Sequence, residues 1–106
     1  MPARRSPSFA VDPYVVDVLL PDLVGHDRRP SAFLIYLVLW RRTTGGRTVA
    51  ALSLRELAEA TGLSKRAVQG ALTTLERRRL IGVERAAPTA VPGYRVLRPW
   101  DRTARR

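Results

Sequence analysis

Polar side chains recur at helical spacing along one stretch near the middle of the chain, residues 64–79. On a helical wheel they share one side, which carries Arg66, Gln69, Gly70, Thr73 and Arg77. None of these five residues is acidic. An arginine can form two hydrogen bonds with guanine, and a glutamine can do the same with adenine. The stretch therefore presents either a surface able to bind nucleobases or an ordinary solvated helix face.

Gly70 is the unusual member of this side, because glycine in a helix interior costs about 1 kcal/mol relative to alanine. It is either a neutral choice on an exposed face or a position where DNA comes close to the helix backbone. The run Arg77, Arg78, Arg79 stands where the helix should end. Cations there favourably meet the helix dipole, and they can equally contact phosphate. Both interpretations of the run stay open.

The residues needed for catalysis or metal binding are nearly absent. The chain of 106 residues has no cysteine and a single histidine, His26. This excludes disulfides, thiolate sites and zinc sites built from several histidines. Asp27 follows His26, but no nucleophile is near in sequence, and the pair is typical of a turn before a helix. Gly45 and Gly46 lack the spacing and the lysine of a phosphate-binding loop. We expect no enzymatic activity, no metal and no cofactor.

The N-terminal segment is expected to supply one short helix. Asp12 can cap free amide groups, and Pro13 fits the first helical position. An apolar stripe follows, formed by Val15, Val16, Leu19, Leu20 and Leu23. Because Pro21 interrupts this pattern, we expect the helix to end near Leu20 and a turn to run from residue 21 to residue 27.

A second helix should begin at Asp27 or Ser31 and run to about Thr43, where the glycine pair at positions 45 and 46 ends it. Its sequence AFLIYLVLW, residues 32–40, is apolar on every side. A helix that is hydrophobic all round must be covered all round. We expect the N-terminal segment to cover one side and a second copy of the chain to cover another. The predicted homodimer would form through the N-terminal segment and the helix 31–43.

A short strand and two capped helices should follow. The segment TVAAL, residues 48–52, suits a brief strand. Ser53 opens the next helix with a capping box, in which Ser53 and Glu56 satisfy each other's free amide groups. Gly62 should end that helix, and Ser64 should cap another that runs to about Arg79. The side of this last helix that faces the core is formed by Val68, Ala71, Leu72 and Leu75.

The C-terminal part should form two short strands. They are LIGVER, residues 80–85, and YRVLR, residues 94–98. The loop between them contains Pro88, Pro92 and Gly93, which favour turns over regular structure. The expected order is helix, helix, strand, helix, helix, strand, strand.

The stretch LRELAEATGLSKRAVQGALTTLERRRLI resembles the helix-turn-helix of bacterial winged-helix DNA-binding proteins, and the resemblance covers roughly residues 31–98. The matching residues are Ala58, Gly62, Leu63, Val68, Leu72 and Leu75. A small residue lets two helices cross, glycine fits the tight turn, and the apolar residues fix the crossing angle. The resemblance implies a mainly α fold with a small β-hairpin, namely a winged helix-turn-helix with an extra N-terminal helical segment.

The resemblance also implies sequence-specific binding of double-stranded DNA. The helix 64–79 would enter the major groove, and the wing, residues 80–98, would lie on the DNA backbone or in the adjacent minor groove. Arg66 and Gln69 are expected to read bases, and Ser64 and Lys65 to lie near phosphate. The expected DNA-binding residues are Ser64, Lys65, Arg66, Gln69, Gly70, Thr73, Arg77, Arg85 and Arg95.

The charge balance favours a polyanionic partner. Nineteen basic residues and nine acidic ones give a net charge of +10, although GC-rich coding alone could produce so many arginines. We expect a flexible basic arm over residues 1–10, one domain over residues 11–100 and a basic tail over residues 101–106. No secretory signal is expected, and the apolar run 32–40 is far shorter than the roughly 20 residues of a membrane span. The expected location is the cytoplasm.

Three functions remain open at this point. The first is a small transcriptional regulator. The second is a DNA-binding module of the replication-initiator type, which the residues do not distinguish from the first. The third is a protein-interaction module. The exposed side of helix 64–79 disfavours it, because that side is polar and basic and offers no apolar patch.

Overall fold

The computed structural model describes residues 7–44 and 47–101. Expectations for residues 1–6, for the glycine pair at 45 and 46 and for residues 102–106 lie outside these ranges. The helical segments are η1 (Val15–Leu19), η2 (Asp22–His26), α1 (Pro30–Arg42), α2 (Leu54–Thr61) and α3 (Lys65–Arg77). The strands are β1 (Ala50–Ala51), β2 (Ile81–Glu84) and β3 (Gly93–Val96). The chain is therefore mainly helical with a small antiparallel sheet, consistent with the predicted winged helix-turn-helix fold.

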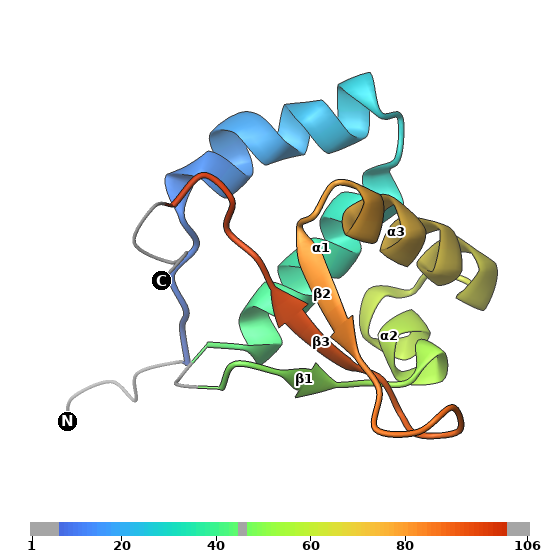
Figure 1. Cartoon of the computed structure of the whole chain (residues 1–106). Coiled ribbons are helices and arrows are strands. Elements are labelled where there is room, and N and C mark those ends of the chain that lie inside the picture. Colours follow the sequence, from blue (N-terminus) through green and yellow to red (C-terminus); the bar gives the residue numbers. More distant parts are fainter. Residues whose placement is uncertain (1–6, 45–46, 102–106) are drawn as a thin grey trace, which may run out of the picture.

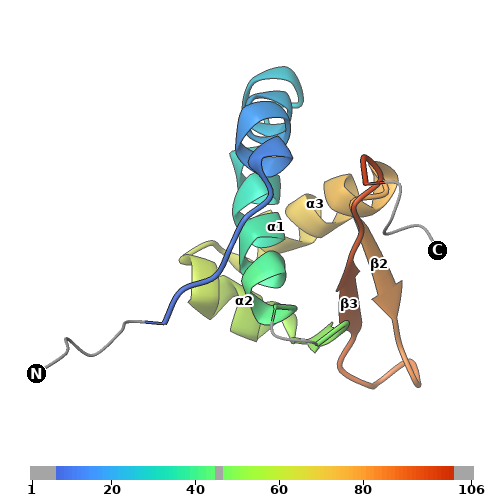
Figure 2. The same cartoon turned by 90° about the vertical axis from the view of Figure 1, so that its left-hand side faces the viewer.

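The sheet has the strand order β1-β3-β2 and lies at one side of the helices (Figures 1 and 2). β2 and β3 form the predicted hairpin, with Val83 opposite Tyr94. β1 covers two residues of the predicted strand and pairs antiparallel with β3. The loop of the hairpin extends beyond the end of the sheet (Figure 1).

α1 supplies the centre of the core. Its fully or almost fully buried residues are Ala32, Ile35, Tyr36, Leu39 and Trp40. The indole of Trp40 donates a hydrogen bond of 2.8 Å to the carbonyl of Ala10, so the N-terminal segment covers part of α1 as predicted. On another side the hydroxyl of Tyr36 donates to the carbonyl of Leu97. In the apolar run 32–40 one residue, Leu34, is exposed.

The N-terminal segment corrects one prediction. Pro21 does not end the helix, because the chain stays helical from residue 13 to residue 26. The turns on both sides of Pro21 are of the wider π type, in which a backbone N–H bonds to the carbonyl five residues earlier, as Asp27 does with Asp22 at 2.9 Å. The missing N–H of proline interrupts this pattern at one position without ending it.

Burial explains why the helix continues through Pro21. Val15, Leu19 and Leu23 recur every four residues and are buried in the core. Their spacing runs through the proline and keeps one face of the segment in the core. The predicted apolar stripe was wrong for Val16, which is 51% exposed, because it lies on the outer side of this segment.

The two helices of the central motif are capped as predicted. Ser53 and Glu56 form the capping box of α2, and Gly62 ends that helix with a φ of 79°. The hydroxyl of Ser64 accepts a hydrogen bond from the amide of Ala67 at the start of α3. No helix in the part of the chain that the structure describes is long and apolar enough to cross a membrane.

Candidate nucleic-acid interface

α3 separates its side chains into a buried face and an exposed face. The residues predicted for the core, Val68, Ala71, Leu72 and Leu75, are all buried. On the other side Arg66, Gln69, Thr73 and Arg77 are exposed, and Gly70 is half-buried. The predicted division of this helix is confirmed.

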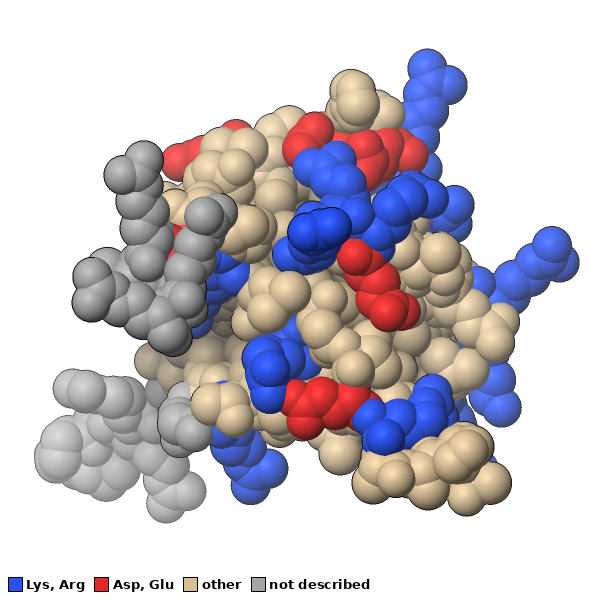
Figure 3. Space-filling view, viewed as in Figure 1, with Lys and Arg blue, Asp and Glu red and all other residues tan. Residues whose placement is uncertain are grey.

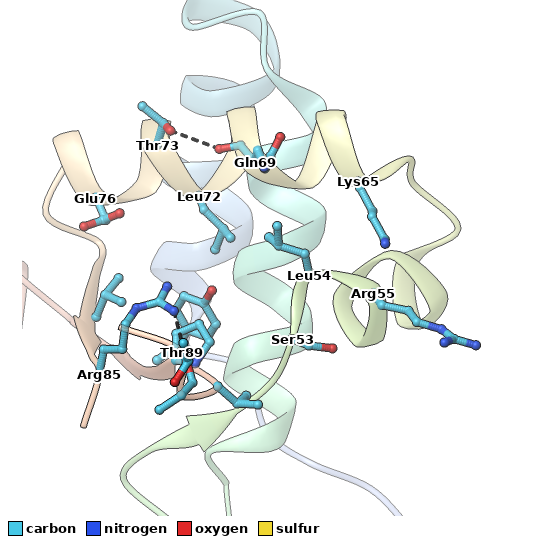
Figure 4. A pocket seen from close by; sticks show the side chains of 15 residues that line it. Ser53, Leu54, Arg55, Lys65, Gln69, Leu72, Thr73, Glu76, Arg85 and Thr89 are labelled. Atoms are coloured by element: carbon cyan, nitrogen blue, oxygen red, sulfur yellow. Dashed lines mark hydrogen bonds between the residues drawn. The ribbon is translucent and has the colours of Figure 1, made fainter. Parts of the chain in front are cut away.

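Two hollows flank α3, and both Gln69 and Thr73 line each of them. These two residues therefore form a ridge between the hollows on the exposed face. The hydroxyl of Thr73 donates a hydrogen bond of 3.0 Å to the carbonyl of Gln69 (Figure 4). The carboxamide of Gln69 projects from this ridge (Figure 4). These two side chains are thus exposed polar groups in the middle of α3.

The wing hollow lies between α3 and the hairpin (Figure 4). Lys65 and Gln69 line it from the helix, and Arg85 lines it from the end of β2. The guanidinium of Arg85 donates a hydrogen bond of 3.0 Å to the carbonyl of Ala90, which holds this cation on the hairpin loop. Buried Tyr94 belongs to the same hollow, and burial raises the pKa of its hydroxyl. The hollow thus has a cation on the helix and another on the wing.

An acidic residue that the sequence analysis did not consider also lines the wing hollow. Glu76 is exposed on α3 and lies on the same flank of the helix as Leu72. Its carboxylate repels anions, so the part of this flank that electrostatically favours an anion extends from Lys65 to about Thr73 and not to the end of α3. Figure 3 shows such acidic side chains among the Lys and Arg side chains of one face of the molecule.

The second hollow, called here the outer hollow, lies on the other flank of α3. Ser64, Arg66 and Gly70 line it together with the ridge. Its remaining cation is Arg29, which precedes α1. An ideal Cβ built on Gly70 would lie 2.6 Å from Nη1 of Arg29, so the guanidinium occupies the place of a side chain. Neither earlier interpretation of Gly70 included this contact.

The structure does not bring two predicted residues to these hollows. Arg77 is exposed at the end of α3 and lines neither of them. Arg95 forms an ion pair with Glu84 on the neighbouring strand. It lines a different hollow together with Arg47 and Arg98. The two wing arginines, Arg85 and Arg95, therefore line different surfaces of the molecule.

Arg78 resolves the open question about the arginine run in favour of a structural role for that residue. Its guanidinium forms ion pairs with Asp22 and Asp27, and thereby ties the end of α3 to the N-terminal segment. A hydrogen bond from His26 and the charge of Arg78 lower the pKa of Asp27. Asp22, His26 and Asp27 are close enough to hold a cation, but Arg78 already pairs with both carboxylates. Arg79 is exposed, with a φ of 57°.

Sequence reasoning missed Arg29, because no local pattern connects it with residues 64–79. The glycine at position 70 was the available signal, since a helical glycine can mark a close approach. What approaches is a side chain from 41 positions earlier in the chain, counting from 70 to 29.

A comparison of the sequence with known protein families identifies the same helices as a helix-turn-helix. A sequence family described as a helix-turn-helix domain matches residues 29–81. This range begins at Arg29, includes α1, α2 and α3, and ends at the first residue of β2. No curated protein and no solved structure matches the chain at a significant level.

Proposed function

The chain belongs to the helix-turn-helix domain family, and from that premise we propose that it binds duplex DNA through the exposed face of α3. The observation that carries this proposal is the ridge of Gln69 and Thr73 with a cationic hollow on each side. An α-helix with its side chains fits the major groove, which is about 12 Å wide. Phosphates would then lie on both sides of α3, next to the cations.

The ridge and its neighbours would read the bases. Gln69 can form two hydrogen bonds with adenine, and Arg66 can form two with guanine. Thr73 offers a methyl group for thymine, because its hydroxyl already bonds to the helix backbone. Gly70 lies in this region as well, but the space left by its missing side chain holds the guanidinium of Arg29.

Phosphate contacts would fix the position of α3 in the groove. Ser64 and Lys65 stand at the start of the helix, where the backbone amides also favour an anion. Arg85 would contact the backbone from the wing. Arg77 would reach phosphate at the far end of α3, and Arg95 could do so after leaving Glu84.

We further propose a transcriptional regulator of the winged helix-turn-helix type in the bacterial cytoplasm, without an enzymatic role. Residues 11–100 would form the DNA-binding domain, and the basic segments 1–10 and 101–106 would add salt-sensitive attraction. Phe9 and Ala10 already contact α1, since Arg41 lies over the Phe9 ring and Ala10 accepts a bond from Trp40. The segment that could reach DNA would therefore precede Phe9.

A homodimer belongs to the same proposal, with the N-terminal segment and the helix 31–43 as its interface. The support is a set of exposed apolar side chains on these elements: Val16, Val18, Val24 and Leu34. A two-fold dimer would present two copies of α3 to two half-sites of the DNA.

Selection of bound fragments from a random duplex pool tests the proposed function. We expect one enriched site that the full chain binds more tightly than random duplex. Gln69→Ala should lower affinity for the enriched site, while Arg47→Ala, at an exposed arginine that lines neither hollow of α3, serves as the control. Failure to retain any duplex at low ionic strength would overturn the proposal.

A further inference from the structure

The backbone on both sides of Arg29 is held in place. The amide of Arg29 donates a hydrogen bond of 2.8 Å to the carbonyl of Leu23, and its own carbonyl accepts one of 3.0 Å from Ala32. Arg28 has a φ of 53°, a backbone conformation that residues other than glycine adopt rarely. Pro30 follows at the first turn of α1 and restricts the residue before it. Arg29 is thus directed by a rigid corner between η2 and α1.

From this corner the side chain of Arg29 reaches α3 at Gly70. An ideal Cβ at Gly70 would lie 2.6 Å from Nη1 and 3.6 Å from Cζ of Arg29. A real Cβ essentially never comes within 3.0 Å of a heavy atom outside its own stretch of chain, so alanine at position 70 would push the guanidinium aside. The missing side chain of Gly70 is what allows Arg29 to lie against α3.

The guanidinium of Arg29 is available for a ligand. Arg29 is exposed, and its side chain forms no hydrogen bond or ion pair within residues 7–44 and 47–101. Arg78 and Arg95, in contrast, each pair with a carboxylate. It shares the outer hollow with Arg66, and no acidic residue lines that hollow among the described residues. Two guanidinium groups without a nearby carboxylate attract an anion.

We propose that Arg29 binds a phosphate of the DNA backbone, on the side of the major groove opposite to that contacted by Arg85, and that Gly70 provides the space for it. The inference rests on the proposed function. Phosphate is favoured over a base because Arg29 comes from outside α3 and lies on its outer flank, beside the ridge that would face the bases. α3 would thus be held between one cation from the wing and one from the start of α1.

The first experiment measures affinity and its salt dependence for Arg29→Ala. We expect binding to weaken about tenfold on the enriched site and on random duplex alike, as the loss of a charge-assisted contact predicts. The slope of log affinity against log salt should fall by about 0.9, which corresponds to one phosphate. Arg29→Lys should recover the slope, and Arg47→Ala, at an exposed arginine that lines neither hollow of α3, should leave both quantities unchanged.

A double-mutant cycle tests the role of Gly70. Gly70→Ala should fold at least as well as the natural chain, because alanine is the better helix former. In the natural background it should weaken binding by displacing Arg29. In the Arg29→Ala background it should have no further effect.

The outcomes separate the inference from the proposed function. If Gln69→Ala weakens binding but Arg29→Ala does not, the inference is wrong and the proposed function stands. An effect of Arg29→Ala on the enriched site alone would show base reading and overturn the phosphate contact. Equal effects of Gly70→Ala in both backgrounds would show that the added methyl group meets DNA directly, which would overturn the role given to Gly70. A natural chain that binds no duplex would refute the function itself.

Discussion

Gln69 and Thr73 owe their accessibility to the residues between and around them. Val68, Ala71 and Leu72 are buried, so the intervening positions of α3 must point outwards. On the exposed face, Arg66 stands one turn before Gly70, next to the cation contributed by Arg29. Base reading and phosphate binding are therefore assigned to neighbouring but different residues.

Arg66→Ala should separate these two roles. We expect affinity for the enriched site to fall by about 1 to 3 kcal/mol, because a guanidinium with two hydrogen bonds to guanine is lost. Affinity for random duplex should barely change. Titration of labelled duplexes by fluorescence anisotropy checks both. Equal losses on the two DNAs would remove Arg66 from base reading.

Gly62 is the residue on which the turn between α2 and α3 depends. Its φ of 79° is one that alanine adopts at a cost of about 1 to 2 kcal/mol. Gly62→Ala should lower the free energy of unfolding by that amount in a urea titration. Gly25→Ala is the matched control, because a Cβ at Gly25 or at Gly62 would meet nothing within 4 Å, while Gly25 has no positive φ. Equal stability of the two variants would contradict this account.

Single residues were predicted well where one element decides their environment. The capping residues Ser53 and Ser64, Gly62 and the buried face of α3 all follow from local spacing. Arg95 was harder, because its partner Glu84 lies on another strand and the register is set by the whole sheet. Glu76 was missed because the helical wheel does not show which flank the hairpin approaches.

The wing is the element that would extend the proposed interface beyond α3. Its two arginines occupy different surroundings: Arg85 is held by the carbonyl of Ala90 beside α3, and Arg95 pairs with Glu84 away from it. The charge of Arg85 is therefore available to DNA, while that of Arg95 is partly balanced by a carboxylate.

Arg85→Ala should weaken binding to the enriched site and to random duplex alike, because the contact is to phosphate. The slope of log affinity against log salt should fall by about 0.9. Arg95→Ala is the control within the same hairpin and should change the slope less. An unchanged slope for Arg85→Ala would show that the wing does not touch phosphate.

The N-terminal helical segment is the second element that tertiary contacts define. Pro21 predicts a helix end by local rules, but the burial of Val15, Leu19 and Leu23 keeps the segment helical. The ion pairs of Arg78 with Asp22 and Asp27 then fix it to the end of α3. Its position was not predictable from sequence, because these partners are more than 50 residues apart.

The ion pair at Asp27 predicts a loss of stability in acid. A hydrogen bond from His26, supported by the charge of Arg78, lowers the pKa of Asp27 below its ordinary value of 3.8. The ionised carboxylate thus stabilises the fold fully above about pH 3.8 and progressively less as the pH falls through the lower folded-state pKa. Asp27→Asn should lose roughly 1 to 3 kcal/mol at neutral pH.

Urea unfolding at several pH values between neutrality and pH 3 checks this prediction. The difference in stability between the natural chain and Asp27→Asn should shrink towards the acid end. Glu56, whose pKa is lowered mainly by the hydrogen bond from the Ser53 backbone, makes both proteins acid-sensitive. A constant difference across the range would show that the charge of Asp27 does not contribute.

At the scale of the whole molecule, the sequence predicted the fold class but not the way distant segments share one surface. Helical and strand periodicity placed α1, α2, α3 and the hairpin close to their observed positions. The outer hollow joins Arg29 and Gly70 through the packing of α1 on α3, which no local pattern contains. The α1 helix is also covered more completely by its own chain than its apolar sequence suggested.

The proposed dimer is a prediction at this scale. The mass in solution, measured by light scattering, should be twice the 11.8 kDa of one chain. Footprinting of the enriched site should show half-sites about 10 to 10.5 base pairs apart, or a multiple of this spacing. Leu34→Ser should lower the fraction of dimer. A single monomer mass with an unrepeated footprint would contradict the two-fold arrangement.

We propose above that the exposed face of α3 is the surface that binds duplex DNA. Mapping of backbone amide shifts by NMR, with the enriched duplex added to the full chain, tests it most directly. We expect the largest changes from Lys65 to Thr73 and at Arg29 and Arg85, with little change near Arg42. Changes centred on Arg95 and the outer side of the sheet, with α3 unaffected, would contradict it.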